Sequence, residues 1–265
     1  MKHYLLNITW RCQLTCSYCW VRRSINTNPE LTKAETRPAI DWARAIERDK
    51  PDILTMGGGE PLSVPWAIDL IRAFPNIKWS LSTNGIMVNK IMELAAQKLG
   101  QIININLSYH PESAQKYDWY FDQWRREIIT LANAGYNVSS NVEKTGDNVK
   151  NSKQAIEWMK LQGLPMLISP ICGGRPELAQ PQPKPLLCEA GTNHLVIAPD
   201  GGAWPCQTAI NSYAWRETYL GNWLDGELDM SKKPVPCHLW CVELYSQYKE
   251  HQAGDFFGIN AREAE

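Results

Sequence analysis

The sequence predicts an α/β fold with a parallel sheet, in which six β-α repeats form a partial barrel that is open on one side. The first ~170 residues alternate between short apolar runs and segments of helical spacing, which is typical of repeated β-α units. Glycine-rich or polar segments follow five of the six predicted strands, where parallel α/β folds bind ligands. After a proline-rich stretch the pattern becomes hairpin-like, which predicts a second, smaller domain.

Each repeat is predicted from its own residues. The expected strands span about residues 4–9, 53–56, 78–82, 102–108, 136–142 and 166–171. The first expected helix begins near Pro38, a favourable first-turn residue, and places Ala39, Ala43 and Ile46 on one face. The later helices cover about residues 66–74, 91–99, 121–131 and 149–162. Together these repeats predict a TIM-like (β/α)6 partial barrel.

The predicted domains follow the change of pattern. Residues 1–174 form the barrel, residues 175–187 form a linker that holds several prolines, and residues 188–265 form the C-terminal domain. In that domain, residues 194–197 and 203–206 flank an Asp200-Gly201 turn, which is typical of a β-hairpin. The rest of the C-terminal domain is weakly periodic.

Composition excludes several classes of protein. The net charge is −1 with no long basic run, so electrostatics do not indicate a nucleic-acid partner. No stretch approaches the ~20 apolar residues of a membrane span, and no signal-type segment stands at the start. We therefore expect a cytoplasmic protein. Because that compartment keeps thiols reduced, the eight cysteines are not expected to form a disulfide framework.

Three cysteines, Cys12, Cys16 and Cys19, stand at C-x3-C-x2-C just after the first predicted strand. Three thiolates on one short loop can converge on one metal centre. A 4Fe–4S cluster held by three cysteines keeps one iron open to a ligand. A zinc knuckle, or a disulfide with a spare thiol, is the alternative that the motif alone leaves open.

A second motif, Gly57-Gly58-Gly59-Glu60-Pro61, follows the second predicted strand. Glycines let backbone groups approach a ligand closely, and one carboxylate beside free N–H and C=O groups can hold an amino group. A tight turn is the plain alternative. Placed one β-α unit after the cysteines, this motif resembles the Gly-Gly-Glu-Pro motif of radical S-adenosylmethionine (SAM) enzymes. The cysteine loop, with Tyr18 before its last cysteine, resembles their cluster loop.

The resemblance covers the first ~170 residues and implies roles for single positions. Cys12, Cys16 and Cys19 would bind the catalytic 4Fe–4S cluster, whose open iron would bind SAM. The positions that it assigns to SAM itself are Tyr18 at the adenine, Gly58, Gly59 and Glu60 at the methionyl amine, and Ser82, Asn84, Ser108 and Asn141 at strand ends. Ser and Asn also cap turns at strand ends. The adenine contacts stay open, because Tyr109-His110 replaces the usual Asp-Gly and no glycine-rich motif stands on strand five.

The second group of cysteines is Cys188, Cys206, Cys237 and Cys241. Four thiolates can hold one more 4Fe–4S cluster or a structural zinc ion. Their context, with a hairpin and a late cysteine pair, resembles the SPASM/twitch extension of radical SAM enzymes. The full SPASM form has about seven cysteines, so the resemblance implies the shorter twitch form with one auxiliary cluster.

Cys172 follows the sixth predicted strand and stands beside two glycines. A buried small hydrophobe is the usual role of a free cysteine. A thiol can also return a hydrogen atom to a carbon radical, and radical SAM epimerases resemble this arrangement. An occasional cluster ligand is the third possibility. His110, at the end of strand four, could contact substrate or move a proton, or simply stand in a turn.

The function expected from these motifs is radical chemistry. SAM would be cleaved reductively, and the 5′-deoxyadenosyl radical would remove a substrate hydrogen. Net oxidation, dehydrogenation or crosslinking would follow, with the auxiliary cluster as electron acceptor. Epimerisation with Cys172 as hydrogen donor is the alternative, and a non-catalytic iron–sulfur or zinc protein is a distant one. The expected partners are a small-molecule or short-peptide substrate and an electron donor such as flavodoxin or ferredoxin.

Overall fold

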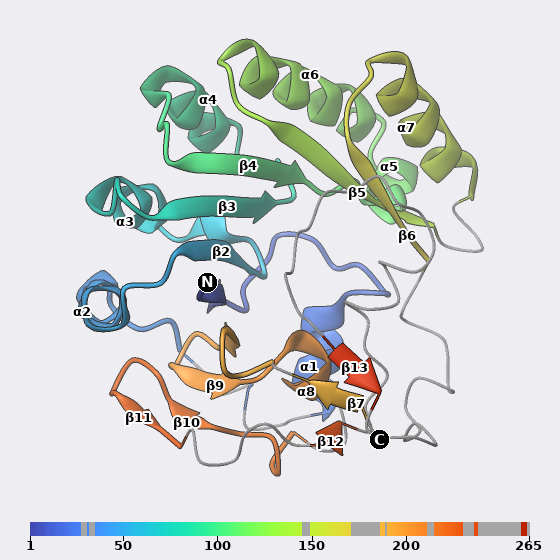
Figure 1. Cartoon of the computed structure of the whole chain (residues 1–265). Coiled ribbons are helices and arrows are strands. Elements are labelled where there is room, and N and C mark those ends of the chain that lie inside the picture. Colours follow the sequence, from blue (N-terminus) through green and yellow to red (C-terminus); the bar gives the residue numbers. More distant parts are fainter. Residues whose placement is uncertain are drawn as a thin grey trace. The chain divides into compact units, whose positions relative to one another are not determined.

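The computed structural model describes residues 1–27, 31, 35–144, 149–170, 186–188, 190–210, 215–229, 236–237 and 261–263 (Figure 1). Contacts divide the chain into two compact units, and each unit is described by itself. The first unit comprises Met1–Trp10, Tyr18–Gly59 and Cys172–Glu265, and the second comprises Arg11–Ser17 and Glu60–Ile171.

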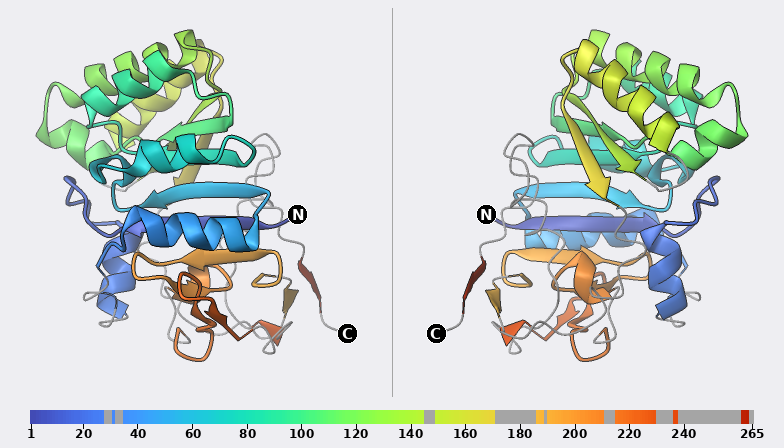
Figure 2. Two further views of the ribbon diagram at one scale, coloured as in Figure 1. Left: turned by 90° about the vertical axis from the view of Figure 1, so that its left-hand side faces the viewer. Right: turned by 90° about the vertical axis from the view of Figure 1, so that its right-hand side faces the viewer.

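The second unit is built on four parallel strands in sequential order. They are β3 (Lys78–Thr83), β4 (Ile102–Leu107), β5 (Val138–Lys144) and β6 (Met166–Pro170). The intervening helices are η2 (Pro61–Ser63), α3 (Ala67–Ala73), α4 (Val88–Gln97), α5 (Pro111–Lys116), α6 (Tyr120–Asn133) and α7 (Val149–Leu161). Figures 1 and 2 show α4, α6 and α7 along one face of these strands. The unit is therefore the α/β arrangement that the sequence predicts.

Apolar alternation explains why these helices cover that face. Trp79 and Leu81 of β3, with Ile105 and Leu107 of β4, are completely buried. In a strand every second side chain shares a face, so these residues form one apolar side of the sheet. Helix α6 supplies Trp124, Ile128 and Leu131, which are buried as well, as the predicted helical spacing requires.

The first unit combines both ends of the described chain. Its strands are β1 (His3–Thr9), β2 (Ile53–Gly58), β8 (His194–Ile197), β9 (Gly202–Trp204), β10 (Gly221–Asn222) and β11 (Glu227–Leu228). Both neighbours of β1, which are β2 and β8, run parallel to it. The strands from β8 to β11 pair antiparallel. The helices are α1 (Trp20–Thr27), α2 (Ala39–Asp49) and α8 (Gln207–Ile210).

The predicted hairpin is confirmed, with β8 and β9 as its arms and Asp200 in its turn, where the carboxylate accepts the Gly202 N–H at 3.0 Å. The parallel pairing of β8 with β1 was not predicted. It joins the C-terminal hairpin to the first barrel strand.

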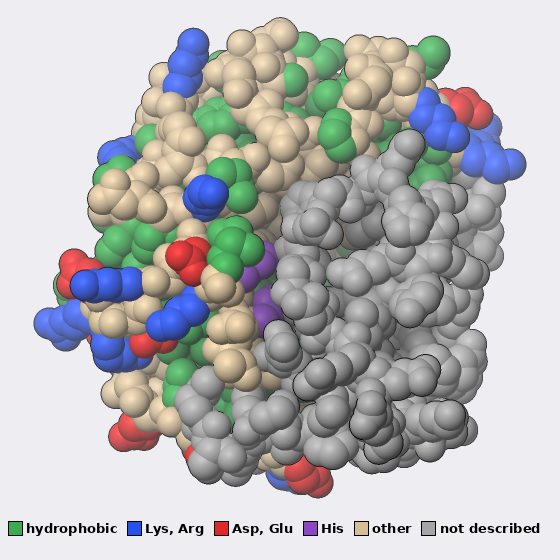
Figure 3. All heavy atoms as spheres, viewed as in Figure 1, with side chains coloured by type: hydrophobic (Ala, Val, Ile, Leu, Met, Phe, Trp, Pro, Cys, Tyr) green, Lys and Arg blue, Asp and Glu red, His purple; other side chains and the backbone are tan. Residues whose placement is uncertain are grey.

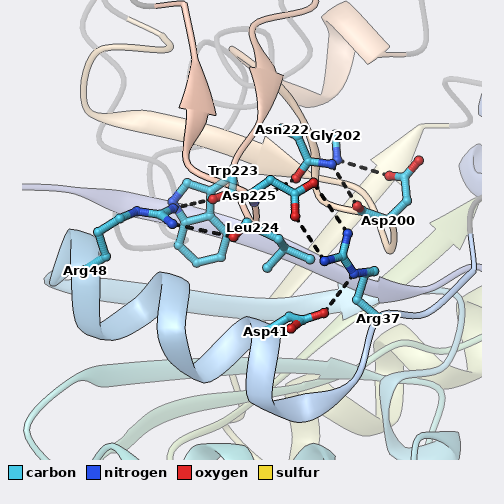
Figure 4. A network of polar contacts seen from close by, with 9 residues as sticks. All are labelled: Arg37, Asp41, Arg48, Asp200, Gly202, Asn222, Trp223, Leu224 and Asp225. Carbon is cyan, nitrogen blue, oxygen red and sulfur yellow. Dashed lines mark hydrogen bonds and ion pairs between the residues drawn. The ribbon is translucent and has the colours of Figure 1, made fainter.

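Polar contacts join residues 223–225 to α2 and to Arg37 just before it (Figure 4). The Arg37 guanidinium binds Asp41 at 2.8 Å and Asp225 at 3.0 Å. Arg48 donates to the backbone carbonyl of Trp223, and the Trp223 indole N–H donates to Asp49 at 2.6 Å. Trp223 is completely buried, so burial of its ring adds to these contacts.

A separate three-stranded sheet joins β7 (Leu186–Cys188), β12 (Pro236–Cys237) and β13 (Ala261–Glu263), with β7 in the middle. Strand β7 begins at Leu186, within the last two residues of the predicted linker 175–187. Two antiparallel partners bind the backbone of residues 186–188, a long-range effect that local composition does not show. Residues 171–185 lie outside the described part of the chain, so the boundary after residue 174 stays a prediction.

Three further differences from the predicted elements have local causes. Strand β5 begins at Val138, because the Tyr136 N–H still donates to the Leu131 carbonyl of α6 at 3.1 Å and closes the end of that helix. The buried face of α2 is Trp42, Ala45 and Ile46 instead of the predicted Ala39, Ala43 and Ile46. Helix α1 was not predicted, since most of its eight residues are polar.

The visible surface carries charges of both signs. Figure 3 shows Lys and Arg mixed with Asp and Glu over α2, with no single-sign field there. Among the residues that the structure describes, no helix is long and apolar enough to cross a bilayer.

Candidate functional site

The cysteine loop runs from the end of β1 to the start of α1. Cys12 is exposed, Cys16 is buried and Cys19 is partly buried, and all three are free thiols. Tyr18, beside Cys19, is also half-buried. Cys12 and Cys16 belong to the second unit, whereas Tyr18 and Cys19 belong to the first. None of the three is joined in a disulfide, so each can serve as a metal ligand.

Contacts with the second unit hold the N-terminal half of this loop. The Asn84 side-chain amide lies 3.5 Å from Cys12 Sγ, which also accepts the Leu14 N–H at 3.4 Å. The Ser17 N–H donates to the Glu112 carboxylate at 2.8 Å, and the Ser17 hydroxyl binds the same carboxylate. The loop is thus tied to the turn after β3 and to the first turn of α5.

His110 also contacts the loop. Its Nδ1 lies 3.5 Å from Cys16 Sγ, and burial lowers the pKa of its imidazole to about 4, against the smaller opposite effect of Glu112. The ring is therefore neutral at pH 7 and carries one N–H. Sequence reasoning suggested contact with substrate or movement of a proton, whereas the structure places this histidine against a predicted cluster ligand.

Glu60 links three segments at the strand ends. Its carboxylate accepts hydrogen bonds from the Leu62 N–H at 3.0 Å, the Thr83 hydroxyl at 2.8 Å and the Asn84 N–H at 2.7 Å. Its own N–H donates to the Arg11 carbonyl at 2.8 Å. Burial raises the carboxyl pKa to about 7, although these hydrogen bonds act in the opposite direction. The side chain is completely buried, so its direct contact with a ligand stays a prediction.

The glycine triplet allows β1 and β2 to approach each other closely. Gly58 has a φ of +111°, and a Cβ there would lie 2.5 Å from the Thr9 carbonyl oxygen. The Gly59 N–H donates to the same oxygen at 2.7 Å. The sequence predicts that these glycines let a ligand approach the backbone closely. In the structure, the group that approaches them closely is the Thr9 carbonyl of β1. Their contact with the methionyl amine stays a prediction.

A polar face occupies β3, β4 and β5. Its members alternate with the apolar residues and are Ser80, Ser82, Asn104, Asn106, Ser108, Ser139 and Asn141. The Asn106 side-chain amide nitrogen donates to the Ser139 hydroxyl, and the Ser108 hydroxyl donates to the Asn106 side-chain oxygen, both at 3.2 Å. Parallel strands are normally apolar on both faces, so this face departs from the rule in the manner expected of a ligand-binding surface.

Sequence reasoning found Ser82, Ser108 and Asn141 on this face but missed Ser80, Asn104, Asn106 and Ser139. The strict alternation of residues 104–108, Asn-Ile-Asn-Leu-Ser, was a signal that could have identified the two asparagines. Asn84 lies beyond the strand end, where its side-chain oxygen accepts the Ile86 N–H at 2.9 Å. It therefore caps a turn, as the alternative held, while its amide nitrogen faces Cys12.

Glu127 of α6 is a buried carboxylate under the turn after β3. Only 4% of the residue is exposed. A Cβ on Gly85, whose φ is +73°, would lie 2.6 Å from Glu127 Oε2. Burial raises the pKa of this carboxyl to about 7; Gln123 and Arg126 lower it, and nearby Glu60 raises it.

We expect Glu127→Gln to flatten the pH dependence of stability. Between pH 4.5 and 7 the folded protein binds more protons at Glu127 than the unfolded chain, so its free energy of unfolding falls as pH rises. A pKa raised from 4.5 to about 7 corresponds to about 3 kcal/mol above pH 7. Urea unfolding from pH 4.5 to 8 measures this effect. The free energy of unfolding of Glu127→Gln relative to that of the native protein should rise as pH rises. The pH dependence of stability that Glu60 causes through its own raised pKa should remain in this variant.

Glu47→Gln on the exposed face of α2 is the matched control and should keep the native pH profile. A Glu127→Gln profile identical to that of the native protein would contradict the account of Glu127.

The predicted auxiliary ligands lie in the first unit where they are described. Cys206 is buried among Trp204, Trp215 and Ala209, and its sulfur accepts the Ala209 N–H at 3.4 Å. Cys188 and Cys237 stand on the paired strands β7 and β12. Because Cys237 pairs with Leu186, the two cysteines lie two register positions apart. Cys172 and Cys241 lie outside the described residues.

The cysteine loop fits an iron–sulfur cluster by its donor chemistry. Its three free thiols stand within eight residues, and Cys12 Sγ already accepts two N–H groups. Among the described side chains, no three His, Cys, Asp or Glu converge on one metal ion. In a 4Fe–4S cluster, however, each cysteine binds a different iron, and hydrogen bonds to sulfur are typical.

Comparison with known proteins identifies the family. The sequence model of the Radical SAM superfamily matches residues 6–175. The chain belongs to the radical SAM superfamily. Membership supports a 4Fe–4S cluster and SAM as its cofactors, an enzymatic role and SAM-dependent radical chemistry, as predicted from the cysteine loop and the glycine motif.

Two curated relatives resemble only part of this chain. Molybdenum cofactor biosynthesis protein 1 of Mus musculus is 26% identical over 106 residues, which are 38% of this chain and 17% of that protein. An uncharacterised protein of Methanocaldococcus jannaschii, MJ0907, is 29% identical over 116 residues, or 41% of this chain and 38% of that protein. The chain thus spans less than a fifth of the mouse relative.

Solved structures of two other proteins share the fold. SuiB of Streptococcus suis bound to SAM aligns with a TM-score of 0.57 at 15% identity, over 89% of this chain and 66% of SuiB. The enzyme anSMEcpe with bound AdoMet and a Kp18Cys peptide aligns with a TM-score of 0.57 at 13% identity, over 88% of this chain and 81% of anSMEcpe. The predicted α/β fold class is therefore confirmed.

Proposed function

We propose that this radical SAM enzyme carries out a net oxidation, a dehydrogenation or crosslinking, with an auxiliary 4Fe–4S cluster as electron acceptor. Cys188, Cys206, Cys237 and Cys241 would bind that cluster in a twitch-type domain. The observation that carries the proposal is the pairing of β7 with β12, which brings Cys188 and Cys237 within two register positions although 49 residues separate them in the chain. Chain entropy opposes such an approach, so a shared ligand would stabilise it.

When bound, the catalytic cluster and SAM would supply a 5′-deoxyadenosyl radical, formed with one electron from a donor such as flavodoxin or ferredoxin, and the radical would take a hydrogen atom from the substrate. An auxiliary cluster would accept the second electron, and solvent would take the proton. The balance is a two-electron oxidation of the substrate.

The chain's own residues would position the reactants. Asn84, His110 and Glu112 hold the cysteine loop, and the polar face of β3, β4 and β5 would orient the substrate. The seven residues named on that face carry hydroxyl and amide groups, and three of them, Asn106, Ser108 and Ser139, are hydrogen-bonded to one another. Such groups can bind the polar atoms of a small molecule or a short peptide. The peptide in the anSMEcpe structure supports the second possibility.

Anaerobic reconstitution tests this function. We expect about eight irons per native chain and about four in the Cys188→Ala/Cys237→Ala double variant. Reductive cleavage of SAM should persist in the double variant, while oxidised product should disappear. Bound zinc in place of iron, with no SAM cleavage, would overturn the enzymatic proposal. Full iron content in the double variant would overturn the ligand assignment.

The Cys172→Ala variant distinguishes oxidation from epimerisation. An oxidase should keep both SAM cleavage and product formation in this variant. Loss of product together with retained SAM cleavage would favour the epimerase alternative, in which Cys172 returns the hydrogen atom.

A further inference from the structure

His110 contacts a predicted ligand of the catalytic cluster. It lies at the N-cap of α5, with φ −108° and ψ 98°. Its Nδ1 lies 3.5 Å from Cys16 Sγ, and only 6% of Cys16 is exposed. The histidine therefore reaches a buried sulfur of the predicted cluster site.

The backbone around His110 fixes the ring against this sulfur. The His110 N–H donates to the Tyr120 hydroxyl at 3.2 Å. Its carbonyl accepts the Ser113 and Ala114 N–H groups at 3.0 and 3.1 Å, and Pro111 occupies the first helical position. The backbone N–H and carbonyl of His110 are thus both hydrogen-bonded, and these bonds fix the position of the Cα that carries the imidazole ring.

The same helix start holds the next residue of the loop. Glu112 of α5 accepts the Ser17 N–H at 2.8 Å, and Ser17 follows Cys16 directly. Two consecutive loop residues are therefore bound by two residues of one helical turn. This arrangement locates Cys16 relative to β4 and α5 without any metal.

The polarity of the contact follows from the chemistry of the ligand. A cluster-binding cysteine is a thiolate, which accepts but cannot donate a hydrogen bond. An Nδ1 without a proton would point a lone pair at this negative sulfur, so an attractive contact requires Nδ1–H. Hydrogen bonds to cluster sulfurs raise the reduction potential, because they stabilise the additional negative charge of the reduced state.

We propose that His110 is a positioning residue that donates a hydrogen bond from Nδ1 to the Cys16 thiolate, and so orients this ligand and raises the reduction potential of the catalytic cluster. The inference rests on the catalytic cluster of the proposed function and is independent of the auxiliary cluster. Asn84 and the Leu14 N–H serve Cys12 in the same manner.

Three substitutions distinguish donation from mere filling of space. The side-chain amide of asparagine places its nitrogen near the position of Nδ1, whereas that of glutamine reaches toward the position of Nε2. We expect His110→Asn to keep the native potential, and His110→Ala and His110→Gln to lower it. A tenfold lower ratio of reduced to oxidised cluster at fixed poise is the expected size, equal to a shift of about 59 mV for one electron.

The measurement is a redox titration followed by electron paramagnetic resonance in the Cys188→Ala/Cys237→Ala background, where only the catalytic cluster contributes. Assembly of this cluster in the background protein is recorded first, so a failure of the proposed function is seen separately. His194→Asn, at a buried histidine of β8, is the matched control and should not move the potential.

A native potential in His110→Ala would overturn the proposal. A native potential in His110→Gln combined with a lowered one in His110→Asn would overturn donation from Nδ1. If His110→Ala does not fold, His110→Asn and His110→Gln still give opposite expected results and decide the question.

Discussion

Cys16→Ala is expected to abolish the catalytic cluster and with it the reductive cleavage of SAM. Two remaining cysteines leave a second iron of the cluster without a protein ligand. Mutation of a residue that only hydrogen-bonds to a metal ligand typically lowers metal affinity or activity by about 10–100-fold. The loss of a ligand itself should therefore reduce the rate of SAM cleavage by more than about 100-fold. Iron analysis should show about four irons fewer per chain.

The fold itself should survive this substitution. Ser17 keeps its N–H on Glu112, and Glu60 keeps its three hydrogen bonds, so circular dichroism should be native. Ser17→Ala, which removes only a hydroxyl from the same loop and keeps that backbone contact, should retain native iron content. Native SAM cleavage by Cys16→Ala would contradict the assignment of the catalytic cluster.

Gly58→Ala is expected to have the second largest effect, on the end of β2. A side chain at a φ of +111° is strained, and its Cβ would lie 2.5 Å from the Thr9 carbonyl oxygen, a contact that real Cβ atoms do not make. Backbone strain of this kind costs about 1–3 kcal/mol, and displacement of a backbone oxygen adds to it. We expect the free energy of unfolding to fall by about 3 kcal/mol or more, and SAM binding to weaken.

Gly57→Ala is the matched control for this effect. A Cβ on Gly57 would meet only Leu5 Cδ1 at 3.6 Å and Asn7 Oδ1 at 4.0 Å, which are ordinary contacts, and its φ is not positive. Urea unfolding should therefore show a change below about 1 kcal/mol, as for a compatible glycine substitution. Equal losses in both variants would contradict the account of Gly58.

Much of the fold follows from local patterns. The six barrel strands and the hairpin after residue 193 were predictable, because a buried strand needs a continuous or alternating apolar run and a tight turn needs residues such as Asp200-Gly201. Helix α1 was not predicted, since Trp20, Val21 and Ile25 are its apolar residues and the other five are polar. The start of β5 was missed because the Tyr136 N–H closes the C-terminal end of α6 on the Leu131 carbonyl, and an apolar run does not show this contact.

The site divides in the same manner. Spacing alone predicted Cys12, Cys16 and Cys19 as cluster ligands, because ligands of one cluster often stand on one short loop. Spacing could not identify His110 as a neighbour of Cys16, since 94 residues separate them. The carboxylate of Glu60 was predicted to serve a ligand, and only the structure shows it bonded to the turn after β3.

By itself the sequence determined the family of this protein, because a three-cysteine loop and a glycine motif of the radical SAM type can be read from residue order. Those features are local, so residue order is enough to specify them. The tertiary structure decided what surrounds the loop, because side chains such as Asn84 and His110 come into contact with it only when parallel strands end at one edge of a sheet. The tertiary structure also shows why residue 58 is glycine. A side chain there would collide with the Thr9 carbonyl oxygen of the neighbouring strand.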